Sequence, residues 1–195
     1  MRILILTFNF GKTSSGNSTE RVIDELFRKG HNVAVVCGND YTKNKNYSVQ
    51  VISPKPLKPS RVLKSLGNFL NKELNNNFWE YRAKKFCLKL IDSFDPDFIY
   101  SRSSPITSMI VGDYLKTKTG KPHFIHFADP IPPTEDWMNK ESERKKNLKT
   151  IKPIFNNADA SFFVTKEMLA FQYGILDKRI DLQKSFVSPN ALLEF

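Results

Sequence analysis

The sequence predicts an α/β domain in which the strands of a mainly parallel sheet alternate with helices. Three observations lead to this fold class. Short apolar runs without alternation, such as Ile3-Leu4-Ile5-Leu6, are typical of strands that are covered on both faces. Segments with apolar residues at helical spacing separate these runs along most of the chain. The first strand, helix and strand have the combined length of a βαβ unit, which joins parallel strands. We therefore expect a doubly wound sheet of about seven strands.

The first predicted strand, residues 2–6, is followed by a helix with clear end signals. Asn17 can cap the start of the helix, and Glu20 stands where a capping box places its returning partner. Gly30 is expected to end it, because a left-handed cap is least strained at glycine. The second strand then occupies residues 31–36.

The middle of the chain, residues 41–77, is expected to add loops and helical segments to this one domain. A polar loop over 38–48 precedes a short strand at 49–52. Three prolines then exclude regular structure before helical periodicity begins at residue 60. Three consecutive asparagines at 75–77 are expected to interrupt that helix.

From residue 78 onwards, helices and strands alternate. A helix over 78–94 is expected to bury Trp79, Ala83, Phe86, Cys87, Leu90 and Ile91. The remaining strands are expected at 98–101, 123–127, 160–164 and 184–187, and the remaining helices at 106–115, 141–156 and 166–173. We find no internal repeat and no long linker, so residues 1–195 are expected to form a single domain.

The composition narrows the setting of the protein. No apolar run approaches the roughly 18 residues that span a bilayer, and 40% of the residues are apolar, enough for a real core. The two cysteines show no metal-ligand spacing, which favours a reducing cytoplasm. The formal charge of +10 favours an anionic partner, namely nucleic acid, anionic lipid or a phosphorylated substrate.

Polar side chains follow two of the predicted strands at the points where the strands end. These candidates for a site are Arg102, Ser103, Ser104, His126 and Asp129. In an open α/β sheet, ligands bind just beyond the carboxyl ends of the strands. His126 or Asp129 could hydrogen-bond a sugar hydroxyl or act as a base. Asp129 could equally cap a turn before a proline.

The polar loop over residues 8–18 contains Gly11 and Gly16 and opens onto a helix. Gly11-Lys12-Thr13 is not a P-loop, because Leu6 stands where that motif requires glycine. The dinucleotide fingerprint is also missing, which argues against a nicotinamide enzyme. The loop could bring backbone N–H groups to an anion, or it could be only a flexible connection.

Two basic segments admit more than one interpretation. Residues 55–72 combine basic and apolar residues, which fits either a helix at a membrane surface or a helix packed on its own domain. A second basic patch at 144–152 could face phosphates or water. Nucleic-acid binding ranks low, since the basic residues are dispersed and no recognition signature occurs. No metal site is visible.

Several short motifs occur in a characteristic order along nearly the whole chain. They are the start 2–6 with its Gly11/Gly16 loop, Lys29-Gly30-His31-Asn32-Val33, Asp95-Pro96-Asp97-Phe98-Ile99-Tyr100 with Arg102-Ser103-Ser104-Pro105, Phe127-Ala128-Asp129-Pro130, Asn157-Ala158-Asp159-Ala160 with Phe162-Phe163-Val164-Thr165, and Val187-Ser188-Pro189-Asn190. In this order they resemble the N-terminal domain of nucleotide-sugar-dependent glycosyltransferases of the GT-B fold, in the retaining group called family four. The resemblance implies a single Rossmann-like domain.

The resemblance also implies roles for individual residues. His126 and Asp129 would be the catalytic pair that orients the acceptor or the reacting sugar. The substrate-binding residues would be Gly11, Gly16, Arg102, Ser103, Ser104 and Asn190. No tightly bound cofactor is expected, since the nucleotide-sugar is the donor substrate. The partners would be a glycan or lipid-linked acceptor, used in polysaccharide biosynthesis, and a second Rossmann-like domain that is missing from this chain.

The sequence departs from the family pattern at a few positions. Ala128 stands where close relatives often have Arg, and Ala191 stands where Gly usually follows the Pro-Asn pair. In the family, two glutamates eight residues apart lie in the second domain. Glu135 and Glu143 have that spacing in the wrong domain, so the role does not transfer. Alone, residues 1–195 would be inactive as an enzyme.

By the same resemblance, the complete enzyme would be a retaining hexosyltransferase of the cytoplasm. Its basic helices would hold it at the anionic inner face of the membrane. The alternative is a non-catalytic α/β module that binds an anionic partner or a membrane surface.

Overall fold

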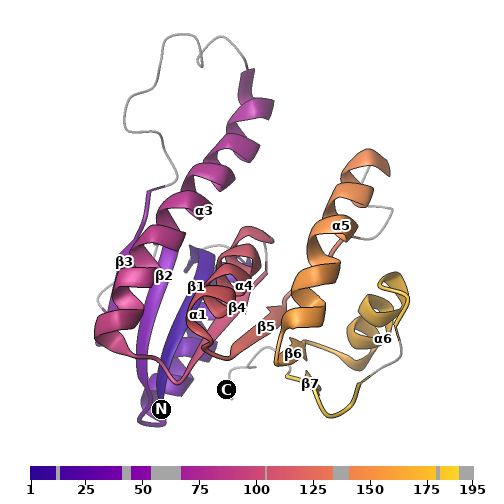
Figure 1. The fold of residues 1–195 in the computed structure, drawn as a ribbon. Helices are drawn as coiled ribbons and strands as arrows, with labels where there is room; N and C mark the ends of the chain where they lie inside the picture. Colours follow the sequence, from indigo (N-terminus) through magenta and orange to yellow (C-terminus); the bar gives the residue numbers. More distant parts are fainter. Residues whose placement is uncertain are drawn as a thin grey trace.

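The computed structural model describes residues 1–11, 14–40, 45–53, 67–103, 105–133, 141–178 and 181–188. Within them lies one seven-stranded sheet with the order β3-β2-β1-β4-β5-β6-β7, and every neighbouring pair of strands is parallel (Figure 1). The predicted fold class, a doubly wound Rossmann-like sheet, is confirmed. The order reverses between β1 and β4, which is the position where such sheets usually bind ligands.

The strands are β1 (Arg2–Phe10), β2 (Asn32–Asp40), β3 (Ser48–Val51), β4 (Phe98–Arg102), β5 (His123–Phe127), β6 (Ala160–Phe163) and β7 (Ser185–Val187). The helices are α1 (Ser14–Arg28), α3 (Gly67–Phe94), α4 (Thr107–Thr119), α5 (Glu141–Asn157) and α6 (Lys166–Ile175). The predicted bounds of β5 are identical to these, and the predicted bounds of β3, β4, β6 and β7 differ by a single residue at one or both ends.

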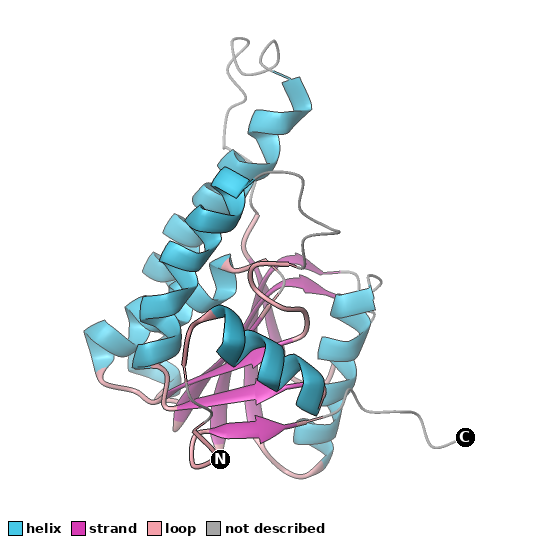
Figure 2. Cartoon of the chain, turned by 90° about the vertical axis from the view of Figure 1, so that its right-hand side faces the viewer, coloured by secondary structure: helices cyan, strands magenta, loops and turns pink. Residues whose placement is uncertain are grey.

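The described helices are divided unequally between the two faces of the sheet (Figure 2). Helices α3 and α4 pack on one face over β1, β2 and β4, and α4, α5 and α6 continue the same layer over β5 and β6. Helix α1 packs on the opposite face through Ile23, against β1 and β2. Because residues alternate along each strand, both faces of the central strands are apolar.

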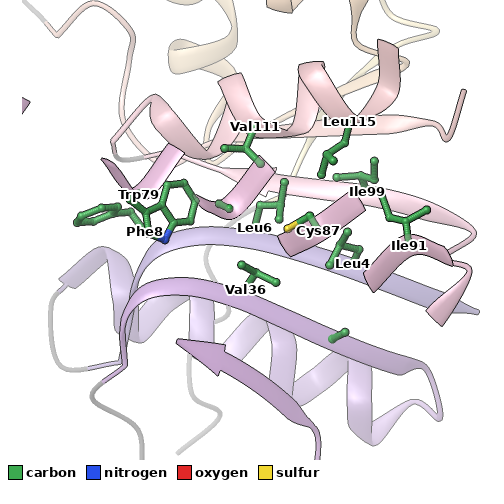
Figure 3. Close-up of a cluster of buried hydrophobic side chains, with 12 residues drawn as sticks. Leu4, Leu6, Phe8, Val36, Trp79, Cys87, Ile91, Ile99, Val111 and Leu115 are labelled. Atoms are coloured by element: carbon green, nitrogen blue, oxygen red, sulfur yellow. The ribbon is translucent and has the colours of Figure 1, made fainter. Parts of the chain in front are cut away.

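The larger core on the α3 side explains why the helix over 78–94 was predictable. Trp79, Ala83, Cys87 and Ile91 recur at helical spacing and are all buried against the central strands (Figure 3). Phe86 and Leu90 are only partly buried at the edge of this cluster.

Strands β1 and β2 are longer than the sequence predicts, so the loops expected over 8–18 and 38–48 are wrong in extent. The physical reason is a tertiary contact between three residues. The ring of Phe8 packs edge-on against Trp79, with ring centroids 5.5 Å apart. Gly38 makes this possible, because a Cβ atom there would lie 2.9 Å from the Phe8 ring.

The predicted start of the first helix at Asn17 is also wrong. Helix α1 begins at Ser14, so Asn17 lies inside it and Gly16 belongs to its first turn. Gly11 has a φ of +73°, a left-handed conformation that favours glycine. The chain therefore turns immediately after β1, and the predicted polar loop shrinks.

The interruption expected at 75–77 does not occur. Helix α3 runs without a break from Gly67 to Phe94, and the packing of its later turns stabilises the whole helix. Residues 41–44 and 54–66, which belong to the predicted elaboration and to the basic segment 55–72, lie outside the described residues. In the part of the chain that is described, no helix combines the length and apolarity that crossing a bilayer requires.

Candidate functional site

The sheet order brings the ends of β1, β4 and β5 to the same edge. Ile3 to Leu6 of β1 lie beside Phe98 to Ser101 of β4. Ile99 to Arg102 lie in turn beside His123 to His126 of β5. Gly11 and Ser103 directly follow β1 and β4, and Asp129 is the second residue after β5. These predicted residues therefore emerge at one edge of the sheet.

A buried arginine connects three elements at this edge. Arg102, the last residue of β4, has no exposed surface. Its Nη1 lies 3.2 Å from Nδ1 of His126 on β5, and its Nη2 donates a hydrogen bond of 2.8 Å to Oγ of Ser18 on α1. A fully buried guanidinium is rare and is retained where it is hydrogen-bonded. Arg102 therefore links β4 to both β5 and the first turns of α1.

His126 lies in a polar cluster with Arg102 and Tyr100. The phenol oxygen of Tyr100 also contacts Nδ1 of His126. Burial, and secondarily the charge of Arg102, holds the pKa of His126 well below its usual range. Burial raises the pKa of Tyr100 to about 12. At neutral pH, the ring and the phenol are therefore both uncharged and Arg102 is the only ion of the three.

One nitrogen of His126 has no hydrogen-bond partner among the described residues. Nε2 is buried, and none of the described residues hydrogen-bonds it. An unsatisfied buried polar group costs about 1–3 kcal/mol. A ligand oxygen at Nε2 would remove that cost, which makes His126 a candidate binding residue. The described residues contain no cluster of His, Cys, Asp or Glu that could hold a metal ion.

Ser103 and Ala128 hold together the two chain segments that leave β4 and β5. The N–H of Ser103 donates to the carbonyl of His126 at 3.0 Å, and Oγ of Ser103 accepts from the N–H of Ala128 at 2.9 Å. Ser103 is itself buried. Its observed bonds fix the loop that contains Asp129, while its predicted contact with substrate stays a prediction.

Asp129 lies in the loop after β5, partly exposed. None of the described residues hydrogen-bonds its carboxylate, so the turn-capping alternative gains no support from them. Gln172 of α6 fixes the same loop further on. It accepts from the N–H of Ile131 at 2.9 Å and donates to the Ile131 carbonyl at 2.6 Å.

Sequence reasoning missed the residues that support this site. Gln172 is fully buried, but nothing in the sequence distinguishes it from a surface glutamine of a helix. Tyr100 and Ser18 were likewise assigned no role. One signal existed, because Tyr100, Arg102 and His126 alternate along two strands that the predicted fold pairs side by side.

The other predicted residues are placed as follows. Gly11 is buried directly after β1, and Gly16 is buried in the first turn of α1. Ser104, Asn190 and Glu135 lie outside the described residues. Glu143 is exposed in the first turn of α5, on which the second basic patch also lies.

Comparisons with known proteins place the fold. No protein-family model matches the sequence, and no curated protein matches it either. Solved structures do match. WaaB, a lipopolysaccharide outer core galactosyltransferase in its apo form, gives a TM-score of 0.58 at 14% identity, over 98% of this chain and 46% of WaaB. MurG from Acinetobacter baumannii gives 0.56 at 10% identity, over 99% of this chain and 46% of MurG.

A UDP-GlcNAc 2-epimerase from Neisseria meningitidis, bound to UDP-GlcNAc, gives a TM-score of 0.57 at 13% identity, over 97% of this chain and 46% of the epimerase. The chain thus has the fold of one half of these proteins. It spans about half the length of the structures that it matches. At such low identity the likeness establishes the fold alone.

Proposed function

We propose that residues 1–195 form the N-terminal, acceptor-binding domain of a GT-B glycosyltransferase. The complete enzyme transfers a sugar from a nucleotide-sugar to a glycan or lipid-linked acceptor in polysaccharide biosynthesis, with retention of configuration. A second Rossmann-like domain supplies most of the donor site. The structural neighbours are consistent with this division, since each is about twice as long as the region that it shares with the chain.

The observation that supports this function best is the cluster of buried Arg102 and His126 with half-buried Ser18 at the edge of the sheet where such folds bind ligands. Buried charge and an unpartnered ring nitrogen are expensive in a domain that only packs. Their free-energy cost is offset where a polar ligand completes the hydrogen bonds, as in a functional site. The position at the reversal of strand order agrees with a polar ligand.

Four of the predicted site residues then have defined tasks. His126 donates to an oxygen of the acceptor or the reacting sugar, and the Asp129 carboxylate accepts from a sugar hydroxyl. Gly11 and Gly16 let the backbone approach the donor phosphates. Catalysis in the complete enzyme comes mainly from positioning and from stabilising the leaving diphosphate.

The neighbours include UDP-GlcNAc 2-epimerases as well as a galactosyltransferase, and the TM-scores do not separate the two classes. We favour the transferase because the ordered sequence motifs resemble retaining transferases. An epimerase rearranges its nucleotide-sugar without an acceptor, so the two functions differ in their products.

The test measures turnover of nucleotide-sugars by residues 1–195 combined with the second domain. The second domain is either on the same polypeptide or supplied as a separate chain. A panel of UDP-, GDP- and ADP-sugars is incubated with and without glycan and lipid-linked acceptors. We expect acceptor-dependent release of the nucleoside diphosphate. Release of an isomerised nucleotide-sugar without acceptor would identify an epimerase, and no turnover with any pair would support the non-catalytic module.

The variants His126→Ala and Asp129→Ala test the site within this assay. Both are expected to reduce turnover, whereas His31→Ala and Asp92→Ala, which alter the same residue types away from the edge, leave it unchanged. Full activity in His126→Ala and Asp129→Ala would show that the site is elsewhere.

We also propose that the protein acts in the cytoplasm at the inner face of the membrane. Helix α5 presents exposed lysines, among them Lys145, Lys149 and Lys152. Such a surface attracts anionic lipid and is screened by salt. Sedimentation with vesicles should therefore require anionic lipid and decline with added salt. Binding independent of both would contradict a role for this charge.

A further inference from the structure

We infer that Arg102 is a positioning residue that fixes the hydrogen of the His126 ring on Nε2, so that His126 serves as a hydrogen-bond donor and not as a base. The inference rests on the proposed function only for the identity of the ligand. Its structural part concerns the protonation state of one ring and can be tested on residues 1–195 alone.

The chemistry of the Arg102 side chain restricts what Nδ1 of His126 can do. A guanidinium has only N–H donors, offers no acceptor and is not deprotonated in proteins. Nη1 of Arg102 lies 3.2 Å from Nδ1 of His126. A hydrogen on Nδ1 would place two donors against each other, so Nδ1 must offer its lone pair.

Only one protonation state of the His126 ring fits beside Arg102. An imidazolium would carry a hydrogen on Nδ1 and a positive charge beside the buried Arg102, and burial disfavours that charge further. Tyr100 does not reverse the choice, because its phenol can donate to the same lone pair. The neutral ring therefore has its one hydrogen on Nε2.

The hydrogen on Nε2 of His126 determines what kind of ligand group can bind there. The N–H at Nε2 is buried, and the described residues offer it no acceptor. A group that completes it must be an acceptor oxygen, such as a sugar hydroxyl, a carbonyl or a phosphoryl oxygen. Nδ1 is occupied by Arg102 and Tyr100, so neither nitrogen is free to remove a proton. A hydrogen-bond donor at this position therefore replaces the base that the sequence also allowed.

The same guanidinium also holds Ser18 of α1 at 2.8 Å. Arg102 thus places the histidine of β5 and the glycine-containing start of α1 relative to each other. One residue sets both the direction of the donor and the position of the backbone that would approach the phosphates.

The test is nitrogen-15 NMR of the histidine rings in residues 1–195, recorded between pH 5.5 and 8. We expect His126 to remain neutral throughout, with its hydrogen on Nε2. His31, which is partly exposed, and His123, whose Nε2 faces the hydroxyl of Ser101, provide internal references in the same spectra. A hydrogen on Nδ1 of His126, or an imidazolium at pH 6, would overturn the inference.

Three variants separate the effect of Arg102 from general packing. Tyr100→Phe removes a neighbour that can adapt, so the Nε2–H form should persist. Arg102→Gln introduces a side chain that can donate or accept, so both ring forms should appear. Arg102→Lys restores a donor-only cation and should restore the Nε2–H form. An unchanged ring in Arg102→Gln, with the fold confirmed by circular dichroism, would show that Arg102 does not fix it.

Function is measured separately. In the complete enzyme, Arg102→Gln should lower kcat by about tenfold, the effect of one weakened hydrogen bond, and Arg102→Lys should recover part of the loss. If the enzyme has no transferase activity but the ring behaves as expected, the proposed function fails and this inference stands. If the transferase is active but His126 carries its hydrogen on Nδ1, the reverse holds.

Discussion

His123 and His126 lie three residues apart on β5, both are buried, and both contact a hydroxyl group on β4. They differ in the face of the sheet that they occupy, because an odd spacing along a strand reverses the side. His123 faces α4, and its Nε2 lies 2.7 Å from Oγ of Ser101. His126 faces the side of α1, where Arg102 contacts it.

The comparison shows that neighbours, and not residue type, decide what a buried histidine can do. Each ring has one nitrogen without a partner among the described residues. At His123 the neighbour is Ser101, whose hydroxyl can donate or accept. The ring hydrogen can therefore lie on either Nδ1 or Nε2. At His126 the ring nitrogen contacts the hydroxyl of Tyr100 and, in addition, an arginine, which can only donate. The first histidine is suited to packing and the second to presenting a donor.

The largest expected effect is on the packing histidine. A Cβ atom at Gly112 of α4 would lie 2.1 Å from Nε2 of His123. Gly112→Ala should therefore lower the free energy of unfolding by about 3 kcal/mol, despite the better helix propensity of alanine. Urea unfolding measures this change.

Two controls accompany that measurement. Gly174→Ala in α6 meets no atom within 4 Å, so it should be neutral or stabilise by less than about 1 kcal/mol. In a protein that already carries His123→Ala, Gly112→Ala should lower the free energy of unfolding much less, because the imidazole ring that clashes with the new Cβ atom is absent. An equal loss of unfolding free energy with and without His123→Ala would mean that the His123 ring does not cause the clash.

The second effect separates the two histidines by activity. His126→Ala should reduce kcat by about 100-fold, since it removes a preorganised donor. His123→Ala should lower stability and leave kcat within about threefold, because removing a packing side chain acts on folding. Steady-state kinetics of the complete enzyme, at a temperature where both variants are folded, gives the comparison. A larger loss of kcat in His123→Ala would reverse the assignment.

The third effect is the dependence of stability on pH. Burial lowers the pKa of His123 from 6.5 to about 3, and that of His126 also lies well below 6.5. Below pH 6.5 the unfolded chain binds protons at both rings and the folded chain does not, so unfolding becomes easier as the pH falls. Each ring should contribute a slope of about 1.4 kcal/mol per pH unit.

Urea unfolding between pH 4.5 and 7 measures that slope. His126→Gln should remove the contribution of one ring, and His123→Gln the other. Variants that left the slope unchanged would show that the rings are already protonated in the folded protein.

The smallest expected effect on stability is that of a substitution in the loop after β5. Asp129→Asn removes the negative charge from a carboxylate that no described residue engages, so stability should change by less than about 0.5 kcal/mol. Turnover should fall about tenfold if the carboxylate accepts from a sugar hydroxyl. Asp92→Asn on α3 is the matched exposed control. A loss of stability without a loss of turnover would favour the turn-capping role.

The sequence by itself determined the fold class and the order of the elements. Continuous apolar runs such as Ile3 to Leu6 are local signals for covered strands. The seven strands predicted along the sequence are the seven strands of the sheet. It also placed Arg102, His126 and Asp129 at one edge, because the carboxyl ends of parallel strands meet there.

Only the tertiary structure decided where several elements begin and end. The lengths of β1 and β2 depend on the packing of Phe8 against Trp79, which is possible because Gly38 has no side chain. The continuity of α3 through residues 75–77 depends on the burial of its later turns. These contacts join residues far apart in the sequence, so no local pattern contains them.

The tertiary structure also decided the character of the site. Arg102, which the sequence marks as a candidate substrate-binding residue, is buried and contacts Ser18 and His126. The position of the hydrogen on the His126 ring depends on the side chains that contact its two nitrogens. The register of β4 and β5 and the lengths of those side chains determine these contacts. The sequence specifies that a histidine lies near the end of the strand, and the fold specifies that Arg102, which can only donate, fixes the hydrogen of its ring.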